Sequence, residues 1–481
     1  MNYSMIRYIL FRLFRIMGFL LMLPFFVAII HKEYDSAESF FLLIVITLVV
    51  GILGSIKKPN STVIYAKEGF AITALAWIFM SMLGAVPFVM TGTIPNYIDA
   101  LFETISGFTT TGGSILTSLD GIEYSVQFWR TFTHWIGGMG VLVFLIAVIP
   151  MVDGYSMHLM RAESPGPVVG KIVPKVKDTA KILYQIYIAI TLLEIICLII
   201  TGMPIYDAVT ITFSTVGTGG FSVNNAGIGG YSIASQAVIT VFMALCGVNF
   251  TVYYFLINRK PKEAFAVDEV KYYFATMLIA ACLISINLYR AGIITDGRLS
   301  FHHSLFAVSS VMTTTGFGTM DFDKWPMFSK MILCLLSLVG ACAGSTGGGF
   351  KFSRAIIVIR NARNELNYLV HPKAVKRVYM DGHTVEGTTV KSVSAYLGLY
   401  VVTFMISCIL VALDDFDFQT TVTSVAATMN NIGPGLGMVG PMGNYSEFSP
   451  LAKIVLMFDM LAGRLELLPI LIFIKPKTWK R

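Results

Sequence analysis

Thr313-Thr314-Thr315-Gly316-Phe317-Gly318 decides the fold, because three other stretches of the chain have a similar pattern. Thr109-Thr110-Thr111-Gly112-Gly113-Ser114 and Gly217-Thr218-Gly219-Gly220-Phe221-Ser222 are close copies, and Asn430-Asn431-Ile432-Gly433-Pro434-Gly435 is a looser one. Successive copies lie 108, 96 and 117 residues apart when they are aligned on their central glycines, Gly112, Gly220, Gly316 and Gly433. This spacing predicts one structural unit that occurs four times.

A short helix is expected before each copy. A polar residue stands thirteen positions before each central glycine, and a run rich in apolar and hydroxyl side chains follows it. The four polar residues, which are expected to cap the helices, are Asp99, Asp207, His303 and Thr420. The runs predict short helices near residues 99–109, 207–217, 303–313 and 418–429, which are too short to cross a bilayer and must therefore enter it and turn back.

Such a unit has a use inside a membrane. Glycine allows the backbone to aim successive carbonyl oxygens at one axis. Rings of carbonyls can replace the hydration shell of an alkali cation, and the C-terminal end of a short helix adds negative potential. Four units in one chain therefore predict a single pore with pseudo-fourfold symmetry.

The composition indicates a polytopic membrane protein. Of 481 residues, 55% are hydrophobic and only 13% are charged, with a mean hydropathy of +0.73. A soluble chain would carry about a quarter charged residues. No small-residue cleavage site follows the apolar N-terminal stretch, so we expect an uncleaved first helix. The six cysteines lie in apolar segments without a Cys-x-x-Cys pair, which favours packing roles over metal or disulfide roles.

Ten apolar stretches are long enough to cross a bilayer. They lie near 8–30, 38–56, 69–91, 124–150, 181–202, 233–257, 271–291, 327–359, 391–412 and 449–474. Most Lys and Arg residues lie on one side of this pattern, in 1–15, 57–67, 151–181, 258–271, 351–391 and 475–481. The positive-inside rule then places both termini in the cytoplasm and all four glycine loops toward the outside. The net charge of +7 is accordingly interpreted as a topology signal, in preference to nucleic-acid binding.

Several function classes are excluded or disfavoured. The cytoplasmic connections are too short for a soluble catalytic domain, and no nucleotide-binding or zinc-protease motif occurs, so we expect no enzyme. An alternating-access carrier remains an alternative, although carriers usually have inverted repeats. A membrane scaffold or receptor would not explain four filter-like loops.

Two further features lie where a gate could be. The run from Gly340 to Gly349 interrupts an apolar span and is interpreted as a flexible loop below the filter, with close helix packing as the alternative. Arg464 lies inside the last span, where a charge must face a cavity or a partner. It either lines the cation path or forms an ion pair with Glu466 or Asp459.

Charged residues toward the outside have less specific interpretations. Arg130 and His134 are expected to have structural roles near the outer interface. The outer loops carry an excess of carboxylates, which either attract cations to the pore mouth or are ordinary solvated charges. These carboxylates are Asp120, Glu123, Asp321, Asp323, Asp414, Asp415, Asp417 and Glu447.

Together these motifs resemble the Trk/Ktr/HKT superfamily of potassium transporters, over nearly the whole chain. The resemblance rests on the four loops, on Ala343–Gly349 and Gly463-Arg464-Leu465-Glu466, and on Arg161-Ala162-Glu163-Ser164-Pro165-Gly166-Pro167. An additional N-terminal hairpin is similar to the TrkH branch. Gly217-Thr218 and Asp459 depart from the family pattern, which has more apolar residues there.

The resemblance implies an all-α membrane fold with a hairpin and four helix–pore loop–helix repeats. The implied boundaries are 1–60 for the hairpin and 61–165, 166–262, 263–372 and 373–481 for the repeats, the third of which has a broken last helix.

It also implies channel-like K⁺ uptake across the bacterial inner membrane by a homodimer with one pore per protomer, without an organic cofactor on this chain. Na⁺, mixed Na⁺/K⁺ or ion-coupled cation transport is the alternative. A cytosolic ring of TrkA-type subunits that bind NAD(H) or ATP is the implied partner. The implied filter residues are Thr110, Thr111, Gly112, Thr218, Gly219, Gly220, Thr314, Thr315, Gly316, Asn431, Ile432 and Gly433. The implied gate residues are Gly344, Ser345, Thr346, Gly347, Gly348, Gly349 and Arg464.

Overall fold

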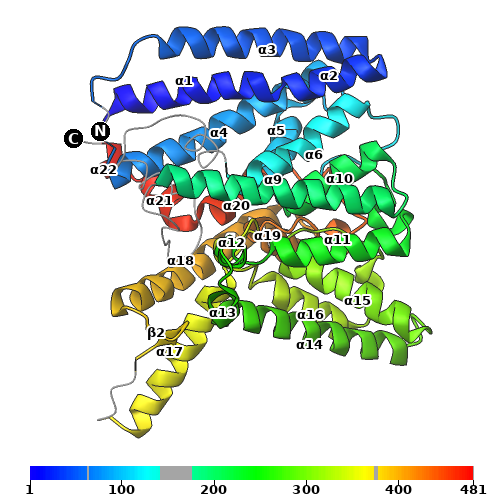
Figure 1. The fold of residues 1–481 in the computed structure, drawn as a ribbon, viewed down its shortest axis with the longest axis vertical. Helices are drawn as coiled ribbons and strands as arrows, with labels where there is room; N and C mark the ends of the chain where they lie inside the picture. The colour runs from blue at the N-terminus through cyan, green and yellow to red at the C-terminus, as the bar shows by residue number, and fades with distance from the viewer. Residues whose placement is uncertain (62–63, 141–175, 373–376, 480–481) are drawn as a thin grey trace.

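The computed structural model describes residues 1–61, 64–140, 176–372 and 377–479 (Figure 1). This part of the chain is almost entirely helical, as expected, and the long helices lie side by side in one general direction. A two-stranded antiparallel hairpin, β1 (Tyr379–Met380) and β2 (His383–Thr384), pairs Tyr379 with Thr384 and Met380 with His383.

The N-terminal helices form a hairpin at one edge of the molecule (Figure 1). They are α1 (Tyr3–Leu20), α2 (Met22–His31) and α3 (Tyr34–Ser55). The backbones of α1 and α3 approach closely because α3 carries glycines at the contact. A Cβ on Gly51 would lie 2.8 Å from the backbone nitrogen of Arg15, and one on Gly54 would overlap the Phe11 ring. Small residues commonly allow such close packing between membrane helices.

Four similar groups of helices follow the hairpin, each with a long helix, a short helix and a second, outgoing segment. The first group is α4 (Ala66–Met90), α5 (Tyr97–Phe108) and α6 (Tyr124–Met139), and the second is α9 (Val176–Ile200), α10 (Ile205–Val216), α11 (Ile233–Cys246) and α12 (Phe250–Ile257). The third is α14 (Asp268–Arg290), α15 (Gly297–Met312), α16 (Met327–Ser337) and α17 (Phe352–Val370). The fourth is α18 (Gly387–Val411), α19 (Phe418–Met429), α20 (Pro450–Leu465) and α21 (Leu467–Ile474).

Short elements connect these groups. They are α13 (Pro261–Ala266), α22 (Pro476–Trp479) and the 3₁₀ turns η1 (Gly227–Gly230), η2 (Phe322–Lys324), η3 (Ala412–Asp414) and η4 (Gly437–Val439).

Three of the four outgoing segments are not single helices, whereas the sequence predicts a break only in the third group. Within the described residues, six helices are long and apolar enough to cross a membrane, and a seventh span results if α11 and α12, which meet at 93°, are counted together. The break expected in the third group is present, because the span at 327–359 is interrupted between α16 and α17. The expected span at 449–474 is wrong as a single helix, since it is interrupted at Glu466, whose φ is +66°. The end of the expected span at 124–150 lies outside the described residues.

The third short helix is longer than expected, since α15 begins at Gly297, six residues before His303. Its cap is Asp296, whose side chain accepts a hydrogen bond from the N–H of Arg298. The expected caps of the other short helices are also wrong, because α5, α10 and α19 have their N-cap residues three positions earlier, at Asn96, Pro204 and Asp417.

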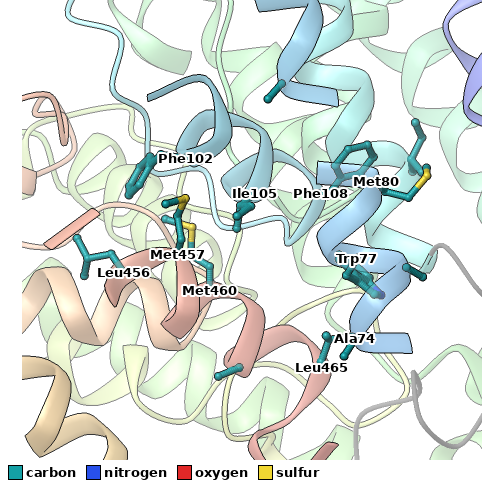
Figure 2. Packing of buried hydrophobic residues seen from close by; sticks show 14 of the residues in the cluster. Ala74, Trp77, Met80, Phe102, Ile105, Phe108, Leu456, Met457, Met460 and Leu465 are labelled. Atoms are coloured by element: carbon teal, nitrogen blue, oxygen red, sulfur yellow. The ribbon is translucent and has the colours of Figure 1, made fainter. Parts of the chain in front are cut away.

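The core nearest the first short helix is formed by α4, α5 and α20 (Figure 2). Phe102 and Phe108 of α5, Trp77 of α4 and Met460 of α20 are at most 1% exposed. In contrast, many large apolar side chains on α3, α9, α14 and α18 are exposed, as expected for helices that face lipid. The short helices are therefore enclosed by the long ones.

Candidate functional site, a ring of four loops

The four short helices end in the same way. α5, α10, α15 and α19 each end four residues before a central glycine. In each loop the N–H of the residue just before that glycine donates a 2.8 Å hydrogen bond to the carbonyl five residues earlier. These bonds run from Thr111 to Ser106, Gly219 to Ser214, Thr315 to Ser310 and Ile432 to Ala427. This is the Schellman arrangement of a helix C-terminus, and it gives all four loops the same register.

The backbone after each short helix alternates between the left-handed region and negative φ angles. The residue two before each glycine is left-handed, with φ of +55° to +60° at Thr110, Thr218, Thr314 and Asn431. The glycines themselves have φ of +78° to +88°, while the residue between has no positive φ. Alternating hands let successive peptide groups converge on one ion. A left-handed conformation costs an L-residue about 1–2 kcal/mol, so the threonines at three of these positions require a compensating interaction.

The four loops form a closed ring. A Cβ added to Gly112 would overlap the carbonyl oxygen of Gly219, and one on Gly220 would overlap that of Thr315. In the same way Gly316 faces the carbonyl of Ile432. Gly433 faces the carbonyl of Thr111, which returns to the first loop. Each central glycine thus contacts the next loop in chain order, and none of the four has space for a side chain.

A cavity of about 260 Å³ lies at this ring, and all four central glycines line it. Among the described residues that line it, Arg130 is the one charged side chain. The outer carboxylates considered as a cation-attracting mouth do not line this cavity. Several have local structural contacts: Asp417 caps α19, and Asp414 accepts a 2.8 Å hydrogen bond from the N–H of Ser449.

Arg130 and His134 of α6 connect the first loop to the second. The Arg130 Nε lies 2.5 Å from Glu103 Oε1, and its guanidinium donates to the carbonyl of Ser222 at 2.8 Å. His134 Nδ1 lies 2.7 Å from the carbonyl of Gly107, and its Nε2 accepts the N–H of Phe221 at 3.2 Å. These contacts fit the expected structural role, because both side chains join α5 to the loop after α10.

Arg464 contacts the ring at Thr110, between the end of α5 and its central glycine. It donates to Thr110 Oγ1 at 3.3 Å and to the carbonyl of Thr346 at 2.6 Å. It also donates to the carbonyls of Gly137 and Gly138 at the end of α6.

The two carboxylates considered as partners of Arg464 have other contacts. Glu466 forms a 2.6 Å ion pair with Arg354, and Asp459 accepts a 2.7 Å hydrogen bond from Ser407. The guanidinium of Arg464 donates to three backbone carbonyls and to the hydroxyl of Thr110.

The segment 343–349 lies beside the same residues, and we call it the gate loop after the role that the sequence predicts for it. The N–H of Gly348 donates to Thr314 Oγ1 at 2.8 Å, which supplies one of the interactions that a left-handed threonine requires. The gate loop also contacts the break between α11 and α12, because Phe250 N donates to the carbonyl of Gly344 at 3.0 Å. Breaks in two outgoing segments therefore meet below the ring.

Two buried charged residues lie beside the gate loop and belong to no motif that is recognisable in the sequence. Lys351 is fully buried, has a φ of +72°, and donates from Nζ to the carbonyl of Gly347. Glu269 at the start of α14 is 2% exposed and accepts hydrogen bonds from Ala343 and Ser353. In the sequence, Glu269 has the position of an ordinary first-turn acid of a helix, so only its long-range contacts distinguish it.

Comparisons with known proteins agree with this architecture. The family model TrkH, described as "Cation transport protein", matches residues 36–481. The Trk system potassium uptake protein TrkH of Salmonella typhimurium is 32% identical over 466 residues, which cover 96% of each chain. The protein of the same name from Escherichia coli K12 is 31% identical over 479 residues, 97% of this chain and 98% of the relative. The crystal structure of the potassium transporter TrkH from Vibrio parahaemolyticus superposes with a TM-score of 0.90 and 29% identity over 100% of both chains.

Proposed function

The chain belongs to the TrkH family of cation transport proteins, and we propose that it conducts K⁺ into a bacterial cell across the inner membrane. The relatives named above are potassium uptake proteins. The observation that carries the proposal for this chain is the closed ring, in which each central glycine faces a carbonyl of the next loop. A ring of backbone carbonyls from four loops is a site for a dehydrated alkali cation.

The proposed filter has two layers. Gly112, Gly220, Gly316 and Gly433 permit the close approach of neighbouring loops, and the carbonyls of the residues just before them face the adjoining loops and form the upper layer. The layer below is formed by Thr110, Thr218, Thr314 and Asn431, which follow the C-terminal ends of the short helices. The negative ends of four helices favour a cation at this depth.

The proposed gate consists of the gate loop and Arg464. Both contact the lower layer of the filter, through Thr314 and Thr110 respectively. At an effective dielectric of about 20, a cation about 5 Å from a guanidinium meets roughly 3 kcal/mol of repulsion. The gate loop adds backbone atoms to this electrostatic barrier, and conduction requires that both move aside.

The proposed assembly is a homodimer of this chain with a cytosolic, nucleotide-binding ring of the TrkA type, and the proposed repeats keep the boundaries expected from the sequence. The names of the relatives refer to a Trk system, which implies a regulatory subunit. The basic cytoplasmic stretch 360–390 is one proposed docking surface, and it includes the end of α17 and the β1–β2 hairpin. The other, 151–180, lies largely outside the described residues.

Ion flux into proteoliposomes tests the proposed function. Gly316→Ser introduces a side chain that would overlap the carbonyl of Ile432, so we expect ⁸⁶Rb⁺ entry to lose its preference over ²²Na⁺. Gly297→Ser is the matched control, since a side chain at Gly297 meets no atom within 4 Å.

Two results would contradict parts of the proposal. Unaltered discrimination in all four single Gly→Ser variants at the ring would remove these residues from the filter. Equal Na⁺ and Rb⁺ entry in the unaltered protein would favour the alternative of a mixed cation transporter. Single-channel recordings then separate a channel from a carrier, because a carrier turns over too slowly to give resolvable current steps.

A further inference from the structure

One carboxylate oxygen connects the two ends of the segment that contains the gate loop. Glu269 Oε1 accepts the N–H of Ala343 at 2.8 Å and the N–H of Ser353 at 2.8 Å. These donors are ten residues apart, and the backbone between them reaches the filter through Gly348. We propose that Glu269 is the latch that holds the gate loop closed, an inference that rests on the gate proposed above.

The latch also completes the start of α17. Lys351, the N-cap residue of α17, provides no side-chain cap, and Ser353 lies in the first turn, where N–H groups have no partner within the helix. Glu269 supplies the acceptor from another helix, at an end where a carboxylate is favoured by the helix dipole. Hydrogen bonds to an ionised acceptor are stronger than neutral ones. One side chain therefore fixes both the entry of the gate loop and the helix that follows it.

The residue next to the latch connects α14 to the cytosolic hairpin. Asp268 Oδ2 forms a 3.0 Å ion pair with Arg360 of α17, and Asp268 N donates to Asp381 Oδ1 at 2.7 Å. Arg360 also donates to the carbonyl of Tyr379 in β1. A force on the β1–β2 hairpin is thus applied to the first turn of α14, the turn that carries Glu269. This places the latch between the proposed docking surface and the proposed gate.

Three substitutions distinguish a latch from a general structural role. Glu269→Ala removes the acceptor, and Glu269→Asp keeps the charge but shortens the side chain by one methylene. Glu269→Gln retains a side-chain oxygen that is able to accept both N–H groups. Glu263→Ala is the control, because Glu263 is a nearby exposed glutamate that pairs with Lys260.

Two measurements on the full-length purified chain read out the latch. Amide hydrogen exchange by mass spectrometry should become faster in peptides covering 341–353 for Ala and Asp. The increase should be smaller for Gln, whose neutral oxygen accepts weaker hydrogen bonds, and the control should exchange at the unaltered rate. In proteoliposomes without any other protein, basal ⁸⁶Rb⁺ flux should rise about tenfold in Ala and Asp, a factor that corresponds to roughly 1.4 kcal/mol. Discrimination against ²²Na⁺ should remain unchanged, because the filter loops are intact.

The outcomes separate the latch from the proposed function. Unchanged exchange in both Ala and Asp overturns the latch, and so does a Gln variant that exchanges as fast as Ala. If Ala fails to fold, Asp and Gln decide the question. Faster exchange without any rise in flux supports the latch and overturns the assignment of the gate loop as the gate. If the unaltered protein does not discriminate between Rb⁺ and Na⁺, this result contradicts the proposed K⁺ filter and leaves the latch unaffected.

Discussion

Threonine is a costly residue for a left-handed backbone position, yet three of the four equivalent positions below the central glycines are threonines. Thr110 and Thr314 each have a hydroxyl that accepts a hydrogen bond, from Arg464 and from the gate loop respectively. Thr218 donates to the carbonyl of Gly217, and Asn431 donates to the carbonyl of Met460. Glycine would relieve the backbone but would provide none of these contacts. The side chains of Thr110, Thr314 and Asn431 therefore tie the proposed filter to other elements, whereas that of Thr218 contacts its own loop.

Removing the charge at Arg464 tests the gate at the scale of one residue. Arg464→Ala should raise basal ⁸⁶Rb⁺ flux by at least about tenfold, because roughly 3 kcal/mol of repulsion at 5 Å disappears. Selectivity for Rb⁺ over Na⁺ should be retained. Arg290→Ala, at an exposed arginine at the end of α14, is the control. A folded Arg464→Ala protein that conducts no faster would show that this arginine is structural and lies outside the path.

At the scale of elements, the outgoing segments of the second and third groups are broken at the same place and are joined there. Cys342 N donates to the carbonyl of Gly247 at 3.1 Å, and Thr346 Oγ1 donates to that of Cys246 at 3.2 Å. Thr346 also accepts from Arg464 of the fourth group. The gate loop is consequently a junction between elements, and any movement of it must break these hydrogen bonds.

This junction predicts that the loop and the arginine are energetically coupled. Deleting residues 346–348 should raise basal flux, as Arg464→Ala does. The double variant should exceed either single one, but by less than the product of the two effects, because the Arg464–Thr346 contact is shared. Contacting residues commonly show such non-additivity. A strictly multiplicative increase in Rb⁺ flux would mean that the two obstructions act separately.

The register of the four loops could be predicted from sequence because a repeated pattern is visible without any partner. The predicted ends of the short helices α5, α10 and α19 lie within two residues of the ends in the structure. Glu269 and Lys351 could not be found in this way. Their importance comes from contacts with the gate loop, and a carboxylate 74 residues away from its donor leaves no local pattern. The break between α11 and α12 was also missed, since Gly247 is a single glycine in an apolar span.

At the scale of the whole molecule, the proposed function assigns regulation to a separate subunit. The sequence contains no nucleotide-binding motif. The purified chain alone should therefore bind neither NAD(H) nor ATP in calorimetry, while a mixture with its regulatory subunit should bind nucleotide. A mixture in which the subunit carries an altered nucleotide site is the control. Tight nucleotide binding by this chain alone would contradict the proposal that a separate subunit binds the nucleotide.

The closed ring has a consequence for how the filter changes over evolution. In a pore assembled from four identical subunits, every substitution is introduced four times at the same level. Here each quadrant is encoded separately, so a single mutation alters one quarter of the ring and leaves three copies as they were. The fourth loop, with Asn431, Ile432 and Pro434, differs in sequence from the other three. In the proposed filter, the ion preference can therefore be changed one quadrant at a time. A tetramer of identical subunits does not allow this, because each mutation alters all four quadrants.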